Sequence, residues 1–334
     1  MVRTNPKRRC CPENVRDTLC KMGYALVGNT SAVQICRWTK NALRGDRGCW
    51  KEKFYGISSA GCCQMTPAMM WCENKCLHCW RPIEMNLGTE LPSVDDPIEI
   101  LEVIVEARKK LLMGFKGRKG IDMKKFKDAL EPKLYTMSLS GEPTLYPRLG
   151  EMFAEIRKRG AISFLVTNGL NPSVLKNLKT LPTQITISMN APNEELFLKW
   201  HRSTKKDAWK TFNETLDVLR DVKGARRVIR LTLVDKGNEG KFNEMTNMSE
   251  ENVEEYCDLI RKVEPDFVHV KGYKSVGYAR ARMGYDNQPW FEAVKDYALK
   301  ICERLEGYKV AAEDERCCVV MLAKKGVKLK IEKC

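Results

Sequence analysis

Three closely spaced cysteines carry the strongest chemical signal in the sequence. Cys72, Cys76 and Cys79 follow a Cys-x3-Cys-x2-Cys spacing. Their thiolates can wrap one face of a cubane and leave one iron open to a small molecule. Because iron–sulfur clusters are normally held by four cysteines, a loop with only three indicates a catalytic cluster. The alternative is a zinc site with His78 as fourth ligand. It is disfavoured because His78, between two of the cysteines, could hardly close a tetrahedron with both neighbours.

The total cysteine content also favours metal sites. The chain has 334 residues and 15 cysteines, most of them between Cys10 and Cys79. Disulfide frameworks are typical of short secreted chains, whereas this chain is long and its N-terminus lacks the apolar segment of a secretory signal. No apolar run approaches the roughly 18 residues that span a bilayer. We therefore expect a cytoplasmic protein without a membrane partner, whose cysteines serve metals or catalysis.

Further polar motifs each follow an apolar, β-branched run. Alone, each would be only a turn signal. Together with the cysteine loop they form an ordered series, as expected of a parallel barrel, where reactive groups lie at the carboxyl ends of the strands. The motifs are Ser140-Gly141-Glu142-Pro143, Thr167-Asn168-Gly169 and Ser188-Met189-Asn190-Ala191.

The elements that must position these motifs alternate between strands and helices after about residue 65. One helix is expected to begin at Asp95-Asp96-Pro97, a capping residue followed by a proline, and to end near Gly114. Such alternation indicates βαβ units and a mostly parallel sheet. The expected strands are 64–71, 134–140, 162–167, 184–189, 228–234 and 267–271.

The predicted fold class is therefore α/β, a partial (β/α)6 barrel of the TIM type with an N-terminal extension that bears cysteines. We expect the extension at 1–63, the barrel at 64–285 and a C-terminal helix and strand extension at 286–334. A further strand is expected around the apolar segment 317–322.

The cysteine loop resembles the signature of the radical S-adenosylmethionine (SAM) superfamily, although His78 stands where a more apolar ring is usual. Residues 140–143 are similar to the superfamily's Gly-Gly-Glu-Pro element, with Ser140 in place of the first glycine. The resemblance implies that Cys72, Cys76 and Cys79 hold a [4Fe–4S] cluster that cleaves SAM. It also implies that SAM is bound by Ser140, Gly141, Glu142, Thr167, Asn168, Ser188 and Asn190.

A second, wider set of cysteines narrows the resemblance. Cys36, Cys49 and Cys62 have a spacing that metal chemistry does not itself demand, and isolated cysteines are more often buried thiols. With the motifs Cys-Trp-Lys at 49–51 and Cys-Trp-Arg-Pro at 79–82, however, the whole chain resembles the tRNA 4-demethylwyosine synthases of the wyosine pathway, in their stand-alone archaeal form. Cys10, Cys11, Cys20 and Cys63 match no motif.

Membership of that family would imply a radical SAM lyase with two [4Fe–4S] clusters, the second on Cys36, Cys49 and Cys62. Lys51 would handle pyruvate. A desolvated amine near cationic irons is partly neutral, as a Schiff-base nucleophile must be. The implied substrate is N1-methylguanosine at position 37 of tRNA-Phe, converted to 4-demethylwyosine (imG-14). The expected partners also include an unidentified electron donor, and we expect a monomer.

The charge of the chain agrees with an RNA substrate. The formal net charge is +15, from 58 basic and 43 acidic residues. Such an excess predicts a polyanionic partner, although a lysine-rich thermophile surface is an alternative. Trp80 and Tyr273 are candidates for stacking on bases. The basic groups are Lys116–Lys127, Arg226–Arg230, Lys271–Arg282 and Lys324–Lys333.

Other functions stay open at this point. Another radical SAM RNA modifier or a radical SAM activase would share the cysteine loop, but neither explains the second cysteine set with Lys51. A zinc-containing RNA-binding protein without catalysis would share the basic charge. It predicts colourless protein, so iron and sulfide analysis would separate it from the enzymes.

Overall fold

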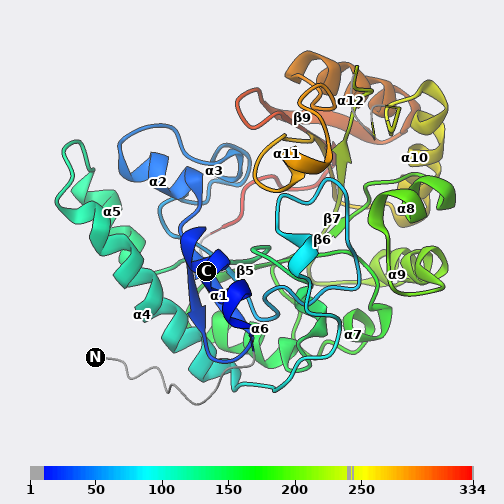
Figure 1. The fold of residues 1–334 in the computed structure, drawn as a ribbon. Helices are drawn as coiled ribbons and strands as arrows, with labels where there is room; N and C mark the ends of the chain where they lie inside the picture. The colour runs from blue at the N-terminus through cyan, green and yellow to red at the C-terminus, as the bar shows by residue number, and fades with distance from the viewer. Residues whose placement is uncertain (1–10, 239–241, 243, 333–334) are drawn as a thin grey trace.

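The computed structural model describes residues 11–238, 242 and 244–332. Its centre is a ten-stranded sheet with the order β1-β2-β3-β4-β5-β6-β7-β8-β10-β9 (Figure 1). Strands β3 to β8 pair in parallel, each with the next in the chain. The predicted α/β fold, a partial (β/α)6 barrel, is confirmed. These six strands are β3 (Cys62–Thr66), β4 (Leu134–Met137), β5 (Ile162–Thr167), β6 (Gln184–Ser188), β7 (Arg226–Leu233) and β8 (Phe267–Gly272).

Helices fill the connections between the parallel strands. The long first connection carries two of them, and the connection from β6 to β7 carries another two. They are α4 (Pro97–Lys116), α5 (Met123–Leu130), α6 (Leu149–Lys158), α7 (Pro172–Lys176), α8 (Glu194–His201), α9 (Ala208–Asp221) and α10 (Glu250–Val263), followed by α11 (Ala279–Arg282) and α12 (Phe291–Arg304).

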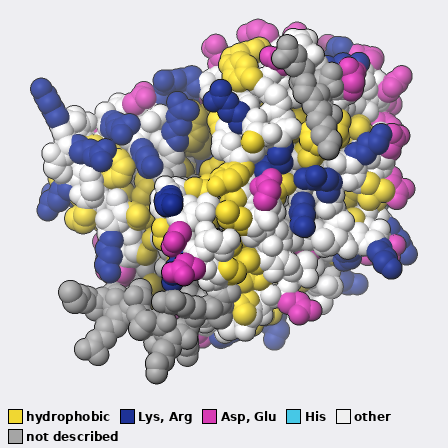
Figure 2. Space-filling view, viewed as in Figure 1, with side chains coloured by type: hydrophobic (Ala, Val, Ile, Leu, Met, Phe, Trp, Pro, Cys, Tyr) yellow, Lys and Arg dark blue, Asp and Glu magenta, His cyan; other side chains and the backbone are white. Residues whose placement is uncertain are grey.

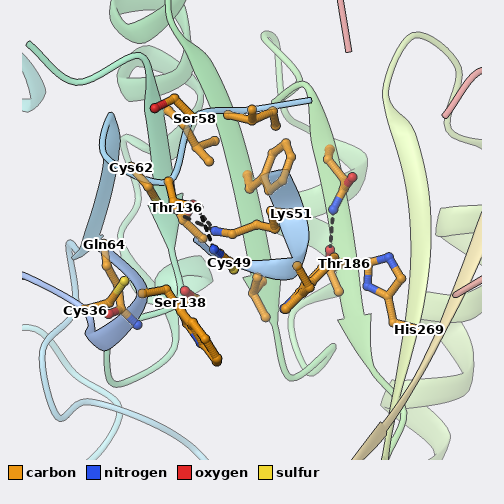
Figure 3. A pocket seen from close by; sticks show the side chains of 18 of the residues that line it. Cys36, Cys49, Lys51, Ser58, Cys62, Gln64, Thr136, Ser138, Thr186 and His269 are labelled. Atoms are coloured by element: carbon orange, nitrogen blue, oxygen red, sulfur yellow. Dashed lines mark hydrogen bonds between the residues drawn. The ribbon is translucent and has the colours of Figure 1, made fainter. Parts of the chain in front are cut away.

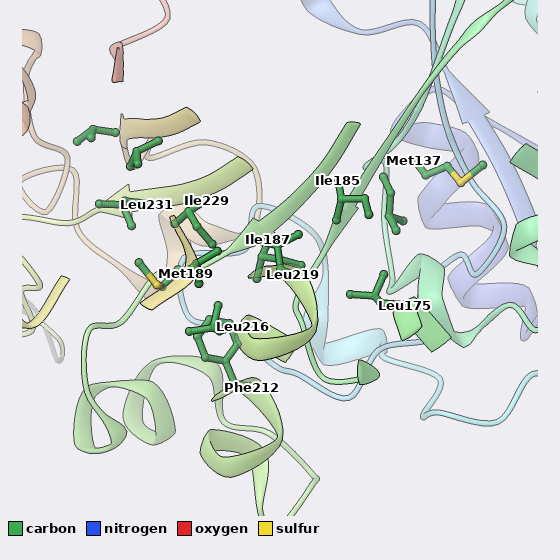
Figure 4. Packing of buried hydrophobic residues seen from close by; sticks show 14 of the residues in the cluster. Met137, Leu175, Ile185, Ile187, Met189, Phe212, Leu216, Leu219, Ile229 and Leu231 are labelled. Atoms are coloured by element: carbon green, nitrogen blue, oxygen red, sulfur yellow. The ribbon is translucent and has the colours of Figure 1, made fainter. Parts of the chain in front are cut away.

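The alternation of side chains along a strand separates the core from the site. On β6, Ile185 and Ile187 are fully buried in the main hydrophobic core. The intervening Gln184, Thr186 and Ser188 instead border cavities inside the barrel. Because successive side chains point to opposite faces of a strand, polar groups enter the interior without disturbing the core. Figure 4 shows the outward cluster, which includes Leu216 and Leu219 of α9 with Ile229 and Leu231 of β7.

Several element boundaries differ from the predicted ones; β4, for example, ends at Met137 rather than at residue 140. The first barrel strand ends at Thr66 rather than near residue 71, because Pro67 lacks an N–H for the ladder and Met70 has φ 66°. Helix α4 is capped by Asp96, whose side chain accepts from the N–H groups of Ile98 and Glu99, as the sequence predicted. It continues past Gly114 to Lys116, and the additional turn buries Phe115.

The N-terminal region lies outside the alternation, as predicted. Strands β1 (Tyr24–Val27) and β2 (Ser31–Gln34) form an antiparallel hairpin that extends the sheet from β3. Three helices belong to this region: α1 (Glu13–Lys21), α2 (Arg37–Leu43) and α3 (Trp50–Tyr55). Phe54 and Tyr55 of α3 pack with Phe164, Val228 and Phe267 of the barrel strands. Helix α3 is thereby fixed against inward-facing side chains of the barrel.

The C-terminal region adds β9 (Tyr308–Asp314) and β10 (Val319–Lys324), and β10 pairs antiparallel with β8. The further strand expected around 317–322 is therefore present. The division into parts at 63/64 and 285/286 stays a prediction, since one sheet includes strands from all three. In the described part of the chain, no helix is long and apolar enough to cross a membrane.

Candidate active site

Two adjoining cavities occupy the barrel interior. The outer cavity, about 910 Å³, is lined by residues at or beyond the carboxyl ends of the strands, such as Ser140, Asn168 and Asn190. The inner cavity, about 190 Å³, is lined by residues farther back on the strands, such as Leu134 and Phe164. The walls shared by both are Cys36, Trp38, Gln64, Ser138, Val166 and Arg230.

The predicted cysteine loop borders the outer cavity. Cys72, Cys76 and Cys79 all line it as free, half-buried thiols. The loop is held by hydrogen bonds from the Cys79 N–H to the Cys76 carbonyl (3.1 Å) and from the Asn74 N–H to Cys72 Sγ (3.4 Å). Burial raises the pKa of all three thiols. Burial thus keeps these thiols protonated until a cationic metal binds them, and three such thiols fit an iron–sulfur cluster.

His78 is not arranged as a zinc ligand. Its Nε2 lies 3.3 Å from Asn190 Nδ2, and burial lowers its pKa well below the usual value. Among the described residues, no three His, Cys, Asp or Glu side chains are placed to hold a single metal ion. The geometry therefore gives no support to a zinc site with His78 as a ligand.

The turn after β4 packs directly against the cysteine loop. Gly141 has φ +67°, and a Cβ atom there would collide with the backbone oxygen of Ala68. The following N–H of Glu142 donates to the carbonyl of Trp71 (2.7 Å), the residue before Cys72. Only glycine permits this approach, so the predicted Gly-Glu-Pro element fixes where the loop starts.

The carboxylate of Glu142 organises the ends of two strands. It accepts from Thr144 Oγ1 (2.7 Å), Thr167 Oγ1 (2.6 Å) and the Asn168 N–H (2.7 Å). Burial, with the nearby Glu73 as a second cause, raises its pKa to about 7. Both carboxylate oxygens are engaged by the protein, so Glu142 positions neighbouring groups at this end of the barrel.

Glu73, inside the cysteine loop, is a residue that the sequence reasoning missed. Its buried carboxylate accepts from Asn168 Nδ2 (3.0 Å) and from Asn171 Nδ2. Asn168 Nδ2 also lies 3.7 Å from Cys72 Sγ. The signal that could have identified Glu73 is its position between Cys72 and Cys76. A carboxylate buried in that loop needs hydrogen-bond donors, which here come from another element.

The remaining predicted SAM residues meet above β6. Ser188 Oγ accepts from Arg230 Nη2 (2.7 Å). Asn190 Nδ2 lies within 3.4 Å of Nε2 of both His78 and His201, while its Oδ1 is buried without a partner. All seven predicted SAM residues thus line the outer cavity: Ser140, Gly141, Glu142, Thr167, Asn168, Ser188 and Asn190. Gly169, the last residue of the Thr-Asn-Gly motif, instead packs against Phe212 and Ile187.

The wider cysteine set converges on the inner cavity (Figure 3). Cys36 stands at the N-cap of α2, Cys49 at the N-cap of α3, and Cys62 begins β3. All three are free thiols that line the cavity. Burial raises the pKa of Cys49 to about 11, against the opposing effect of Lys51. Three thiols from different elements therefore share one small space, which fits a second metal cluster.

Lys51 lies inside the inner cavity with these cysteines. Its Nζ donates to Thr136 Oγ1 (3.1 Å) and to Cys62 Sγ (3.5 Å) and lies 5.8 Å from the ring of Phe164. Burial lowers the pKa of Lys51, but Cys62, Cys49 and Cys36 together raise it above the usual value. The amine of Lys51 thus lies beside the sulfur of Cys62, and its predicted role toward pyruvate stays a prediction.

One predicted basic group is not a surface group. Arg226 lies over the rings of Tyr55 (4.7 Å) and Phe267 (4.5 Å). Arg227 donates to the carbonyl of Arg220 (2.9 Å), and Arg230 faces the cavities. These three side chains are thus half-buried and engaged by the protein, so this group is not a freely exposed basic patch. Of the stacking candidates, Trp80 is 37% exposed beside the outer cavity whereas Tyr273 is buried.

Comparisons with known proteins agree with this geometry. Residues 66–249 match the Radical SAM superfamily, and residues 262–324 match the Wyosine base formation family. The chain is 41% identical to the SAM-dependent tRNA 4-demethylwyosine synthase of Pyrococcus abyssi, over 98% of this chain and 92% of that protein. The corresponding enzyme of Pyrococcus horikoshii is 40% identical over the same shares. A solved structure of TYW1 with a lysine–pyruvate adduct bound superposes with a TM-score of 0.82 at 30% identity, covering 97% of this chain and 99% of that one.

The partial parallel barrel with a three-cysteine loop at its carboxyl edge defines a radical SAM enzyme, which uses SAM and a [4Fe–4S] cluster. Within that class, the chain belongs to the family of SAM-dependent tRNA 4-demethylwyosine synthases. The alternatives of an activase or a zinc-containing RNA-binding protein are thereby set aside.

Proposed function

We propose that this enzyme converts N1-methylguanosine at position 37 of tRNA-Phe to 4-demethylwyosine, with pyruvate as the second substrate. One observation carries the proposal: the Lys51 amine and three free thiols share a small cavity that adjoins the larger cavity of the radical SAM loop. The name of the Pyrococcus abyssi relative and the lysine–pyruvate adduct in the TYW1 structure support it.

In this proposal, Cys72, Cys76 and Cys79 hold the cluster that, with SAM, supplies a hydrogen-abstracting radical when bound. The surrounding residues bind and orient SAM. Gly141 allows the turn after β4 to approach the cysteine loop closely. The proposed SAM-binding residues are Ser140, Gly141, Glu142, Thr167, Asn168, Ser188 and Asn190.

The inner cavity would hold the second [4Fe–4S] cluster on Cys36, Cys49 and Cys62. Lys51 is the proposed catalytic amine: its nitrogen attacks the carbonyl carbon of pyruvate, water leaves, and a carbon–nitrogen double bond forms. Thr136 orients this amine through its hydroxyl group. Burial favours the neutral form of this amine, whereas the neighbouring sulfur atoms of Cys62, Cys49 and Cys36 favour the charged form.

The outer cavity would receive the RNA base. Its lining includes Arg37, Lys40 and Arg44 of α2 on one side and Lys274 on the other. Figure 2 shows Lys and Arg side chains spread over this face, including the side formed by α2 and α5. These cations can contact phosphates while the target base leaves its stack and enters the cavity. We further propose an external electron donor, a monomeric enzyme and, given the tRNA substrate, a cytoplasmic location.

The test is nucleoside analysis of a methylated tRNA transcript after anaerobic incubation with SAM, dithionite and pyruvate. Lys51→Ala should still cleave SAM slowly to 5′-deoxyadenosine but should form no 4-demethylwyosine. Lys51→Arg should fail as well, because a guanidinium stays protonated. Lys53→Ala is the matched control, since Lys53 lies on the same helix but is exposed and donates to the Glu313 carbonyl. Normal product formation by Lys51→Ala would remove this lysine from the mechanism.

A further inference from the structure

Arg230 is a cation inside the barrel without an acidic partner. It lies on β7 and lines both the inner and the outer cavity. Within the described residues, its one hydrogen bond runs from Nη2 to the Ser188 hydroxyl (2.7 Å), and its Nε is buried without a partner. Burial lowers the pKa of Arg230 to about 10, so the side chain stays charged at neutral pH. A charge withdrawn from water in this way calls for an anion.

The lining of the inner cavity limits which anion that is. Among the described residues around it, only Lys51 and Arg230 carry positive charge, and none carries a carboxylate. His269 also borders the cavity, but burial lowers its pKa to about 3, so it is neutral. If Lys51 captures the carbonyl of an α-keto acid, the carboxylate of that acid stays in the same small space. Arg230 is then the remaining cationic side chain that the described residues of the cavity offer to bind it.

We propose that Arg230 binds the carboxylate of the keto acid held by Lys51 and thereby selects pyruvate over neutral ketones. This proposal rests on the proposed role of Lys51. A guanidinium suits the task because its planar donors match a carboxylate in two parallel hydrogen bonds. The hydrogen bond to Ser188 occupies Nη2 on one side and keeps Nε available.

The carboxylate of SAM is the other anion that could bind Arg230, since Arg230 also borders the outer cavity. That cavity, however, offers further cations, among them Arg81, Arg37 and Lys40. Among the described residues, the lining of the inner cavity offers no cationic side chain beyond Lys51 and Arg230. Pyruvate therefore depends on Arg230 more strongly than SAM does.

The proposal can be tested without turnover. Reconstituted enzyme is incubated with increasing pyruvate and cyanoborohydride, which adds hydride to the carbon–nitrogen double bond and leaves a stable secondary amine on Lys51. Intact-protein mass spectrometry gives the pyruvate concentration for half-maximal adduct. Arg230→Gln should raise this pyruvate concentration about 10- to 100-fold, because the variant loses a charge-assisted hydrogen-bonded pair with the carboxylate. Arg230→Lys should raise it less, since the charge remains.

Lys271→Gln is the matched control. Lys271 is a neighbouring cation on β8 that lines the outer cavity alone, with its Nζ donating to the Cys317 carbonyl (3.1 Å). It should leave the half-maximal concentration unchanged. Iron content and thermal melting of each variant check the fold.

A second titration uses pyruvamide, which keeps the ketone and lacks the negative charge. Wild type and Arg230→Gln should form its adduct at the same concentrations, which excludes a general effect on Lys51. If Arg230→Gln leaves the pyruvate curve unchanged, the proposal for Arg230 is overturned while the role of Lys51 stands. The same holds if, in a separate SAM titration, Arg230→Gln raises only the half-saturating concentration of SAM. Absence of any adduct in wild type refutes the amine role of Lys51 and this proposal with it.

Discussion

The two cysteine sets are built in opposite ways. Cys72, Cys76 and Cys79 lie in one short loop, so their proximity is assured by the chain itself. Cys36, Cys49 and Cys62 precede or begin three different elements and meet only when α2, α3 and β3 are in place. A local metal site can be recognised from spacing alone, whereas a distributed one depends on the complete fold.

The two sets nevertheless share one structural feature, an arginine that donates hydrogen bonds to the cysteine backbone. Arg108 of α4 donates to the carbonyls of Ala60 (2.7 Å) and Cys62 (3.2 Å). Arg282 of α11 donates to the carbonyls of Leu77 (3.1 Å) and Cys79. In each case the arginine comes from a distant part of the chain, so even the local loop has its position set by tertiary contacts.

The largest effect is expected from replacing the local set. Cys72→Ala combined with Cys76→Ala and Cys79→Ala should abolish SAM cleavage and product formation, because the cluster that cleaves SAM has no other ligands there. Two cubanes correspond to about eight irons per chain, so the variant should retain about half of the wild-type iron. Iron analysis and EPR after anaerobic reconstitution measure this. Full iron retention would contradict the assignment of these cysteines.

Replacing one cysteine of the distributed set should separate the two halves of the reaction. Cys62→Ala is expected to lower the iron content toward half and to prevent 4-demethylwyosine formation, while 5′-deoxyadenosine still forms. Cys63→Ala is the matched control, since Cys63 is the next residue on the same strand but points into the main core. Product yield and iron content are compared in the two variants. Equal behaviour of the pair would show that the second site is not where we place it.

Salt should distinguish the outer cavity from the inner one. Binding of an anticodon-stem RNA should weaken roughly 10³-fold or more between low and moderate salt if several phosphates are contacted. Formation of the pyruvate adduct in the inner cavity should change much less, since buried charges are screened weakly. Fluorescence titration and adduct trapping at two salt concentrations give both values. If the RNA affinity does not change with salt, the basic residues are better explained as a lysine-rich surface of the thermophile type.

The smallest effects are expected from the two arginines. Arg108→Met and Arg282→Met each remove charged hydrogen bonds to carbonyls, which should cost about 2 kcal/mol of unfolding free energy. Arg108→Met should preferentially lower iron at the second site, and Arg282→Met at the first. Denaturant unfolding and EPR of the reconstituted variants test this. A loss of both clusters in both variants would mean that the two sites are not independently supported.

Much of the site could be predicted because its residues are close in sequence or lie at strand ends. The Gly-Glu-Pro turn, Thr167 and Ser188 follow apolar runs, and parallel strands bring their carboxyl ends together. Glu73, Arg108 and Arg230 were not predicted as site residues. Their roles depend on which partner each side chain meets, and no local pattern specifies that partner.

The sequence by itself determined the alternation of strands and helices in the barrel, the local cysteine loop and the polar residues after its strands. These features depend on spacing and on the two-residue period of a strand, which are properties of the local chain. Only the tertiary structure decided that Cys36, Cys49 and Cys62 share a cavity with Lys51 and that Arg230 faces both cavities. The physical reason is packing: α3 buries Phe54 and Tyr55 against inward-facing strand residues, and this contact between distant segments carries Cys49 and Lys51 into the barrel.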